Sequence, residues 1–281
     1  MELIGKKDIM SLYRSPAPRL VASLAMSLFG INHINKLYEA TYNKGDQCAA
    51  SLLDILRTTY SVDAAELANI PGEGACIIVS NHPTGGMDGV LLIDMLSKVR
   101  ADVKFMGNFI LQRIKSLSQY FIPVDPYRQH DPQGNVRGVK MAADHLLEGG
   151  VLVVFPAGEV SRWRKDLGCV ADTPWRRSMI RFIRNSGAPV VPLYIEARNS
   201  RTFHLLGDLH PFLRTAMLPR EFTNKRHKKI PVRIGCPIPA NEKTEALSRE
   251  EFGDMLRGRV YALKNAPVPA CDGCDGSKNC E

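Results

Sequence analysis

The chain has 281 residues, of which 44% are hydrophobic and 23% are charged, so it can bury a sizeable core as ordinary globular proteins do. This composition excludes a chain that is disordered throughout. The formal net charge of +8 favours an anionic partner, and it leaves open nucleic acid, anionic lipid and a phosphorylated substrate.

The beginning of the chain shows no apolar segment followed by a cleavage site, so we expect no signal peptide. The most apolar early stretch, Leu20 to Ile31, has about twelve residues, fewer than the roughly 20 that cross a bilayer. Arg19 and Lys36 flank this stretch, as in helices that lie in a membrane surface, although a helix packed on the domain shows the same pattern. We expect residues 1–68 to form an N-terminal helical segment that contacts a membrane.

From about residue 75 onward, short apolar runs alternate with amphipathic ones. We predict strands over residues 75–79, 103–106, 121–124, 151–155, 190–195 and 232–234. We predict helices over residues 46–68, from Asp88 onward, over 139–147 and over 175–184. This alternation indicates an α/β domain over residues 69–265, with a mostly parallel central sheet flanked by helices. Residues 266–281 are expected to form a flexible, cysteine-containing tail.

Seven cysteines are an odd number, and four of them, Cys48, Cys76, Cys169 and Cys236, are scattered with no spacing typical of a disulfide framework, so a reducing compartment fits best. The tail contains Cys271, Cys274 and Cys280, which offer three thiolates to a metal. Because a closed zinc site needs about four ligands and no fourth is evident nearby, we predict a reduced tail and no bound metal.

The best candidate for catalysis is His82, which directly follows the first strong strand. Functional groups collect at the carboxyl ends of strands in open α/β sheets. A neutral imidazole can take the proton of an alcohol while a carboxylate, here Asp88, holds the other ring nitrogen. Gly85 and Gly86 let the intervening loop adopt unusual backbone angles. The alternative is that Asp88 only caps a helix and that His82 only bonds to the backbone.

Four segments of the chain occur in a characteristic order, namely Asn81–Asp88, Phe121–Arg128, Gly150–Arg162 and Ala188–Ile195. This order resembles the four blocks of the glycerolipid and lysophospholipid acyltransferase superfamily. Those blocks are NHxxxxD, a strand that ends before a basic residue, FPEGTRS, and a final VPV-like strand. The resemblance spans residues 70–200.

The chain departs from this pattern in three places. Between His82 and Asp88 stand five residues, one more than the family usually has. Ala157 occupies the position of the family's glutamate, and Glu159 follows two residues later. The second block is loosened to Asp125-Pro126-Tyr127-Arg128. These departures resemble a hemolysin-like bacterial branch that forms ornithine and other aminoacyl lipids.

The resemblance implies an O-acyltransferase in which His82 and Asp88 are catalytic and no acyl-enzyme forms. The acceptor would be the hydroxyl of a lysophospholipid or lyso-aminolipid, and the co-substrate would be acyl carrier protein or coenzyme A carrying the acyl group, with no bound cofactor. Backbone N–H groups near Gly85, Gly86 and Gly158 are the oxyanion candidates. The substrate-binding candidates are Arg128, Phe155, Pro156, Gly158, Glu159, Ser161 and Arg162.

Two other functions remain as alternatives. The first is a thioesterase or ester hydrolase in which the same histidine activates water, although water needs no acceptor-binding residue such as Arg162. The second is a basic nucleic-acid-binding protein, but the basic stretch from Arg220 to Arg233 has only Phe222 as an interleaved aromatic residue. We expect a peripheral enzyme on the cytoplasmic face of the inner membrane, bound to anionic lipid and not to nucleic acid.

Overall fold

The structure is a computed structural model. It describes Leu3, Gly5 and residues 26–108, 111, 113–124, 132–240 and 247–265, with the side chains of 132–135 excepted. The helices are α3 (Ile31–Thr41), α4 (Cys48–Leu56), α5 (Ala64–Leu67), α6 (Gly86–Leu96), α7 (Pro132–Leu147), α8 (Arg177–Asn185), α9 (Arg201–Leu209), α10 (Pro211–Ala216), α11 (Leu218–Thr223) and α12 (Arg249–Ala262). The strands are β1 (Thr59–Ser61), β2 (Cys76–Ser80), β3 (Val103–Asn108), β4 (Phe121–Val124), β5 (Val151–Val154), β6 (Arg162–Arg164), β7 (Cys169–Ala171), β8 (Val190–Ile195) and β9 (Lys229–Ile234).

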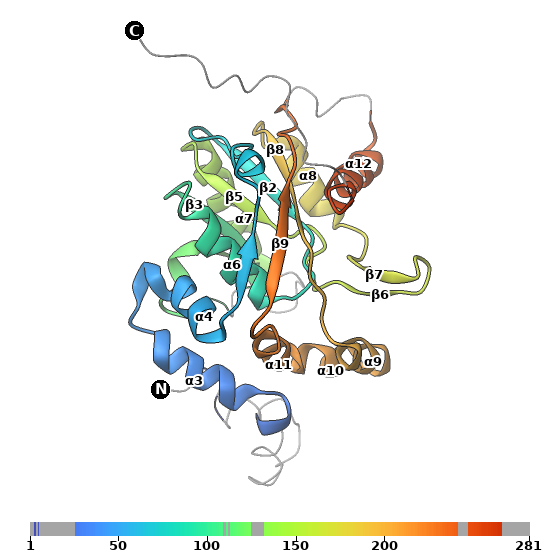
Figure 1. The fold of residues 1–281 in the computed structure, drawn as a ribbon. Coiled ribbons are helices and arrows are strands. Elements are labelled where there is room, and N and C mark those ends of the chain that lie inside the picture. The colour runs from blue at the N-terminus through green and yellow to red at the C-terminus, as the bar shows by residue number, and fades with distance from the viewer. Residues whose placement is uncertain are drawn as a thin grey trace.

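Seven strands form the central sheet in the order β1-β9-β8-β2-β5-β3-β4 (Figure 1). Each strand pairs with its neighbours in parallel except β9, which runs antiparallel to β8. In the centre, Ile78 of β2 stands opposite Val153 of β5 and Val191 of β8. The predicted α/β fold with a mostly parallel central sheet is therefore confirmed.

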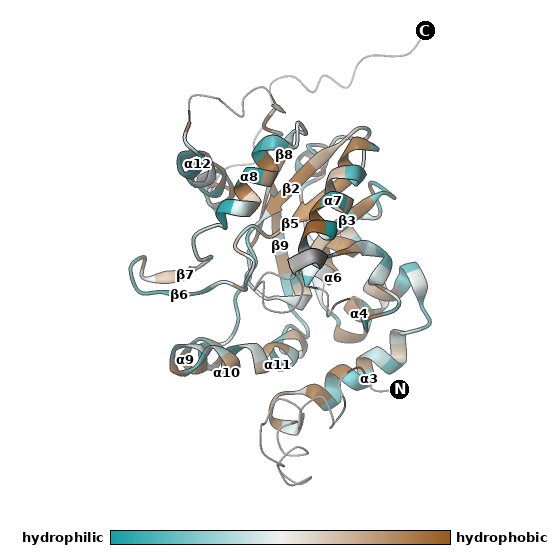
Figure 2. Cartoon of the chain, turned by 180° about the vertical axis from the view of Figure 1, so that it is seen from behind, coloured by the Kyte–Doolittle hydropathy of each residue, from teal (hydrophilic) through white to brown (hydrophobic). Residues whose placement is uncertain are grey.

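Helices cover both faces of the sheet because alternate residues of its buried strands point to opposite sides. Ile78 belongs to the core that contains side chains of α4 and α6. Its neighbour Ile77 belongs to the core on the other face, which contains side chains of α7, α8 and α12. The central strands are also the most hydrophobic elements in Figure 2, as expected for strands buried on both faces.

The elements that precede the sheet differ in part from the prediction. Residues 46–68 were predicted to be helical, and α4 and α5 lie there, but β1 lies there too and adds an edge strand to the sheet. Helix α3 buries Ile31, Leu37 and Tyr38 and contacts α4 and α11. Most of the apolar stretch 20–31 lies outside the described residues, and membrane contact of the N-terminal segment stays a prediction, as do the domain limits.

Helices long and apolar enough to cross a bilayer are absent from the described ranges. In the same ranges, no cluster of three or more His, Cys, Asp or Glu side chains is placed to hold a metal. Cys48, Cys76 and Cys169 are free thiols, whereas Cys236 is disulfide-bonded, which the expected reducing compartment does not account for. Cys271, Cys274 and Cys280 lie outside the described residues.

Candidate active site

The candidate site begins where β2 and β8 end side by side. The side chain of Asn81 accepts a hydrogen bond from the N–H of Ile195 at 2.7 Å and donates one to the carbonyl of Ile195 at 3.0 Å. These two hydrogen bonds hold the chain just beyond β2 against the last residue of β8. His82 comes next, so the neighbouring strand fixes its backbone position.

His82 and Asp88 are in contact despite the extra residue between them. Nδ1 of His82 lies 3.0 Å from Oδ2 of Asp88, although Nδ1 lacks the alignment of a full hydrogen bond. Catalytic hydrogen bonds are often poorly aligned before substrate binds, so the distance is the more informative quantity. The His82 side chain is 19% exposed and the Asp88 side chain 1%. The imidazole thus faces solvent on one side and a buried carboxylate on the other.

The Asp88 carboxylate is held from the loop that contains the extra residue. Oδ2 accepts the backbone N–H groups of Thr84 at 2.8 Å and of Gly85 at 3.0 Å, and Oδ1 accepts the Thr84 hydroxyl. Such bonds fix the carboxylate at the start of α6, where an acidic side chain is also favoured by the helix dipole. Asp88 is therefore both a helix-capping residue and the partner of His82.

Two of the backbone N–H groups that were predicted to bind the oxyanion already have acceptors in the structure. The N–H of Gly85 is already donated to Asp88, and the N–H of Gly158 is donated to the carbonyl of Phe155 at 2.9 Å. Gly86 is the first residue of α6, where a backbone N–H has no acceptor within the helix. Of the glycines named from the sequence, Gly86 is thus the one that remains a candidate donor.

Gly85 is required at its position for reasons of geometry. Its φ is +82°, which L side chains rarely adopt. A Cβ on this residue would also lie 3.1 Å from Leu218 and 3.2 Å from Val160. The loop after His82 therefore packs against both α11 and the third sequence block.

Asp172 is a site residue that sequence reasoning missed. Its buried carboxylate accepts the backbone N–H of His82 at 3.2 Å, the Ser161 hydroxyl at 2.5 Å and the Trp175 indole N–H at 3.1 Å. Burial raises the pKa of Asp172, while the bonds from Ser161 and Trp175 act in the opposite direction. Asp172 joins the His82 loop to the segment before α8. Its only sequence signal is an aspartate directly after the apolar pair Val170-Ala171.

The third block lies directly beside His82. The ring of Phe155 stacks on the imidazole with centroids 4.0 Å apart, and the N–H of Ser161 donates to the carbonyl of His82 at 2.8 Å. Pro156 is buried, and its carbonyl accepts the N–H of Arg176 at 2.9 Å. The structure thus brings Phe155 and Ser161 to the candidate base, whereas the contact of Pro156 is with Arg176.

The charged candidates of the third block point to different partners. Glu159 forms an ion pair with Arg214 of α10, with Oε2 and Nη2 2.7 Å apart, so its carboxylate is directed at α10. Arg162 is exposed on β6, which pairs with β7 as a two-stranded hairpin. Arg128 lies outside the described residues. A depression lined by Asp46 and Lys104, among others, lies near the start of β3 and includes none of these residues.

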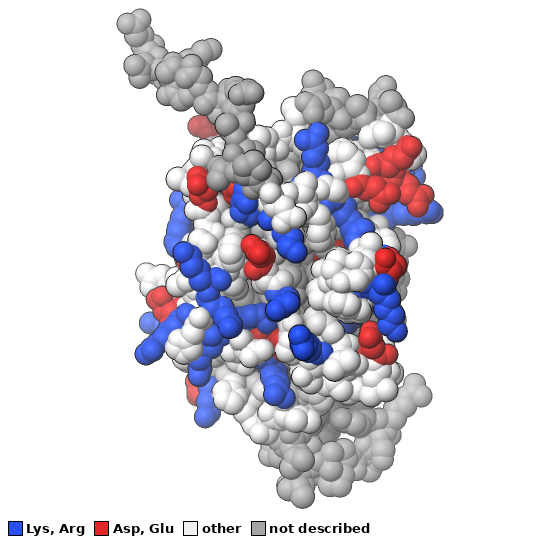
Figure 3. All heavy atoms as spheres, turned by 45° about the vertical axis from the view of Figure 1, so that its right-hand side comes forward, with Lys and Arg blue, Asp and Glu red and all other residues white. Residues whose placement is uncertain are grey.

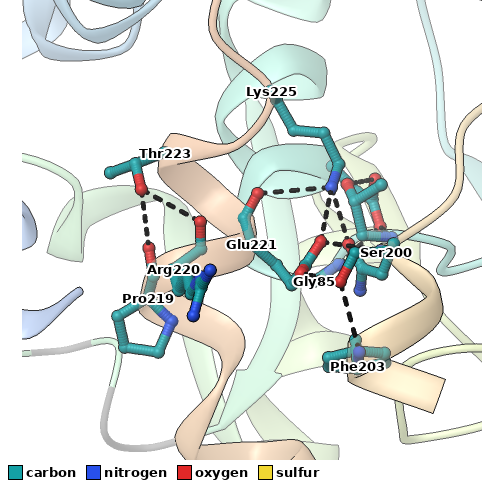
Figure 4. A network of polar contacts seen from close by, with 11 residues as sticks. Gly85, Ser200, Phe203, Pro219, Arg220, Glu221, Thr223 and Lys225 are labelled. Carbon is teal, nitrogen blue, oxygen red and sulfur yellow. Dashed lines mark hydrogen bonds and ion pairs between the residues drawn. The ribbon is translucent and has the colours of Figure 1, made fainter. Parts of the chain in front are cut away.

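A second missed feature is the buried ion pair of Glu221 and Lys225 (Figure 4). Nζ of Lys225 lies 3.2 Å from Oε2 of Glu221 and donates to Oδ1 of Asn199 at 2.8 Å. Glu221 also accepts the N–H of Ser200 at 2.9 Å. Burial lowers the pKa of Lys225, while the charges of Glu221 and Asp88 raise it. This network fixes α11 behind the Gly85 loop.

Known proteins resemble this chain over most of its length. A family model described as acyltransferase matches residues 32–269. The lyso-glycine lipid O-acyltransferase of Phocaeicola vulgatus is 28% identical over 254 residues, which cover 88% of each chain. The lyso-glycine lipid O-acyltransferase of Bacteroides thetaiotaomicron is 28% identical over 261 residues, covering 88% of this chain and 90% of the relative.

Among solved structures, the chain resembles a 1-acyl-sn-glycerophosphate acyltransferase, PlsC, from Thermotoga maritima. The TM-score is 0.49, the sequence identity is 20%, and 83% of each chain is covered.

Proposed function

Since the chain belongs to this acyltransferase family, we propose that it transfers a fatty acyl group from a thioester to the hydroxyl of a lyso-aminolipid, with His82 as general base. The observation that carries the mechanism is the 3.0 Å contact between His82 and the buried Asp88 at the carboxyl end of β2. A histidine held in this way is positioned to act as a general base.

The proposed reaction needs no acyl-enzyme. Because Nδ1 of His82 faces Asp88, the opposite ring nitrogen, Nε2, takes the proton of the acceptor hydroxyl. The hydroxyl oxygen attacks the thioester carbonyl, the C–S bond breaks, and the imidazolium returns the proton to the leaving thiolate. Asp88 stabilises the imidazolium in between. The products are an ester and a free thiol, and the N–H of Gly86 is the backbone donor that we assign to the oxyanion.

Two relatives support an aminolipid as acceptor. Both are named lyso-glycine lipid O-acyltransferases, and each aligns with most of this chain. A glycine headgroup carries a carboxylate, which an exposed arginine such as Arg162 can bind through its two parallel N–H groups. Arg128 keeps the same proposed role from the sequence pattern. The acyl donor that we propose is acyl carrier protein or coenzyme A.

Charge supports the proposed location at an anionic membrane surface. Lys and Arg side chains are spread over the face shown in Figure 3 and gather on its left side, in line with the net charge of +8. Such a charge favours anionic headgroups and an acidic carrier protein alike. We propose a peripheral enzyme at the cytoplasmic face of the inner membrane, with no nucleic acid among its partners.

The test is acyl transfer by the purified protein, with lyso-glycine lipid and lysophosphatidic acid as parallel acceptors and acyl carrier protein or coenzyme A as carrier. We expect ester formation with the lyso-glycine lipid. His82→Ala removes the base and is expected to lower the rate by about 100-fold or more. His204→Ala, at a histidine on α9, is the matched control and should keep transfer.

Three results would contradict the proposal. Undiminished transfer by His82→Ala would exclude His82 as the base. Release of free fatty acid without any ester product would instead show a hydrolase. Transfer to lysophosphatidic acid alone would overturn the aminolipid acceptor while leaving the acyltransferase chemistry intact.

A further inference from the structure

Two neighbouring elements at the site end of the sheet expose large apolar side chains. On α9, Leu205 and Leu209 are 69% and 75% exposed, and their spacing places them on one face of the helix. The β6–β7 hairpin exposes Trp163 and Leu167. Helix α9 contacts β6, and Figures 1 and 2 both show the hairpin next to α9. We call these four residues, with Phe212 at the start of α10, the α9–hairpin surface.

Exposed apolar side chains that lie on neighbouring elements and form one patch mark a surface that binds lipid or protein. Their surroundings are basic. Residues 161–170 contain three basic side chains and one acidic side chain, a net charge of +2. Residues 198–214 also contain three basic side chains and one acidic side chain, again a net charge of +2. Arg162, Lys165 and Arg201 are exposed within these stretches. Apolar groups with basic groups beside them are the combination that binds an anionic bilayer surface.

The type of apolar residue also fits a lipid interface. Tryptophan is enriched where membrane meets water because one edge of its ring is apolar and its N–H can remain hydrated. Trp163 is exposed, and in the sequence it directly follows Arg162 and stands two residues before Lys165. A protein interface of standard size would instead be expected to have fewer charged groups at its centre.

The α9–hairpin surface is joined to the candidate base by short connections. Ser161, the residue before β6, donates its N–H to the carbonyl of His82 at 2.8 Å. Arg214 of α10 pairs with Glu159 at 2.7 Å, within the block whose Phe155 stacks on His82. A lipid held at this surface therefore lies next to the elements that carry the site.

We propose that the α9–hairpin surface docks on an anionic lipid bilayer and that the lysolipid reaches His82 from there. Leu205, Leu209, Phe212, Trp163 and Leu167 enter the headgroup region, and Lys165 and Arg201 meet the anionic headgroups. This inference rests on the proposed function for its substrate, but the docking itself is measurable without catalysis.

The experiment is co-sedimentation of the full chain with vesicles of phosphatidylglycerol and phosphatidylcholine, and with vesicles of phosphatidylcholine alone. The wild type is expected to bind the anionic vesicles, and salt should weaken this binding because it screens the basic residues. The double variant Leu205→Glu/Leu209→Glu is expected to lose about tenfold or more in affinity, because two apolar contacts become two negative charges.

Leu147→Glu provides the control. Leu147 is 85% exposed at the end of α7, just before β5 begins and thus at the opposite end of the sheet. The Leu147→Glu variant has a negative charge at a comparably exposed position, and it should bind vesicles like the wild type. Thermal unfolding of all variants checks that the fold is kept.

Activity separates this inference from the proposed function. Transfer is measured with the lysolipid in anionic vesicles and with a short-chain lysolipid that stays monomeric. We expect the double variant to lose transfer in vesicles and to keep it with the monomeric acceptor. Equal vesicle binding by the double variant and the wild type would overturn the docking surface. A wild type that binds vesicles but transfers to neither form would overturn the proposed function and leave the docking surface standing.

Discussion

The backbone N–H of His82 donates to the carboxylate of Asp172 at 3.2 Å, although ninety residues separate the two in the chain. The same carboxylate accepts the Ser161 hydroxyl and the Trp175 indole. Asp172 therefore fixes the backbone of the candidate base relative to two other segments, and it does so from a fully buried position.

Asp172→Ala should destabilise the protein and lower acyl transfer. The change leaves three buried donors without an acceptor, and we expect a loss of about 3 kcal/mol in the free energy of unfolding. Urea denaturation followed by circular dichroism measures the loss. Asp172→Asn retains one acceptor oxygen, so its free energy of unfolding should lie between those of Asp172→Ala and the wild type. A free energy of unfolding for Asp172→Ala equal to that of the wild type would show that these bonds contribute nothing.

Removing one partner of the Glu221–Lys225 pair should cost more than removing both. Lys225→Met leaves a buried carboxylate without its cation and is expected to cost about 3 kcal/mol of unfolding free energy. In Glu221→Gln/Lys225→Met no buried charge is left unpaired, so much of that loss should be recovered. A double-mutant cycle by urea denaturation gives the coupling. Additive single effects would contradict the pairing.

The pH dependence of stability should carry a contribution from Glu221. Burial alone would raise the pKa of Glu221, but bonds from Ser200 and the charge of Lys225 outweigh it and hold the pKa below the ordinary 4.5. The unfolded state then binds the proton more readily, so this contribution is complete above about pH 4.5 and is lost as the pH falls through the lower folded-state pKa. Glu221→Gln should show a shallower loss of unfolding free energy on acidification than the wild type. Parallel curves would exclude Glu221 as a source of the pH dependence.

Gly158→Ala should be more harmful than Gly187→Ala. Both glycines have a φ of +70°, so an alanine at either position meets similar backbone strain of about 1 kcal/mol. A Cβ at Gly158 would also lie 2.4 Å from Nε of Arg176, whereas nothing lies within 4 Å at Gly187. Because Arg176 must then give up its bond to the Ala157 carbonyl, Gly158→Ala should lose about 1 kcal/mol more. Thermal denaturation of both variants and their transfer rates measure the difference; equal effects would show that Arg176 moves without cost.

Several elements could be predicted from the sequence because their signal is local. β2, β5 and β8 are uninterrupted apolar runs, as strands buried on both faces must be, and the predicted ranges agree with the observed ones within about two residues. The amphipathic pattern likewise indicated α8. β1 and the β6–β7 hairpin were not predicted, since strands of three residues are stabilised by pairing with distant or exposed partners.

For the candidate site, the sequence by itself determined that His82 follows a buried strand and that Asp88 stands at the start of a helix. Only the tertiary structure decided that they lie 3.0 Å apart across five residues, because the φ of Gly85 and the bonds from Thr84 set the shape of that loop. Asp172 also needed the tertiary structure. Its partner His82 is ninety residues away, and a hydrogen bond across that separation leaves no periodic pattern in the sequence.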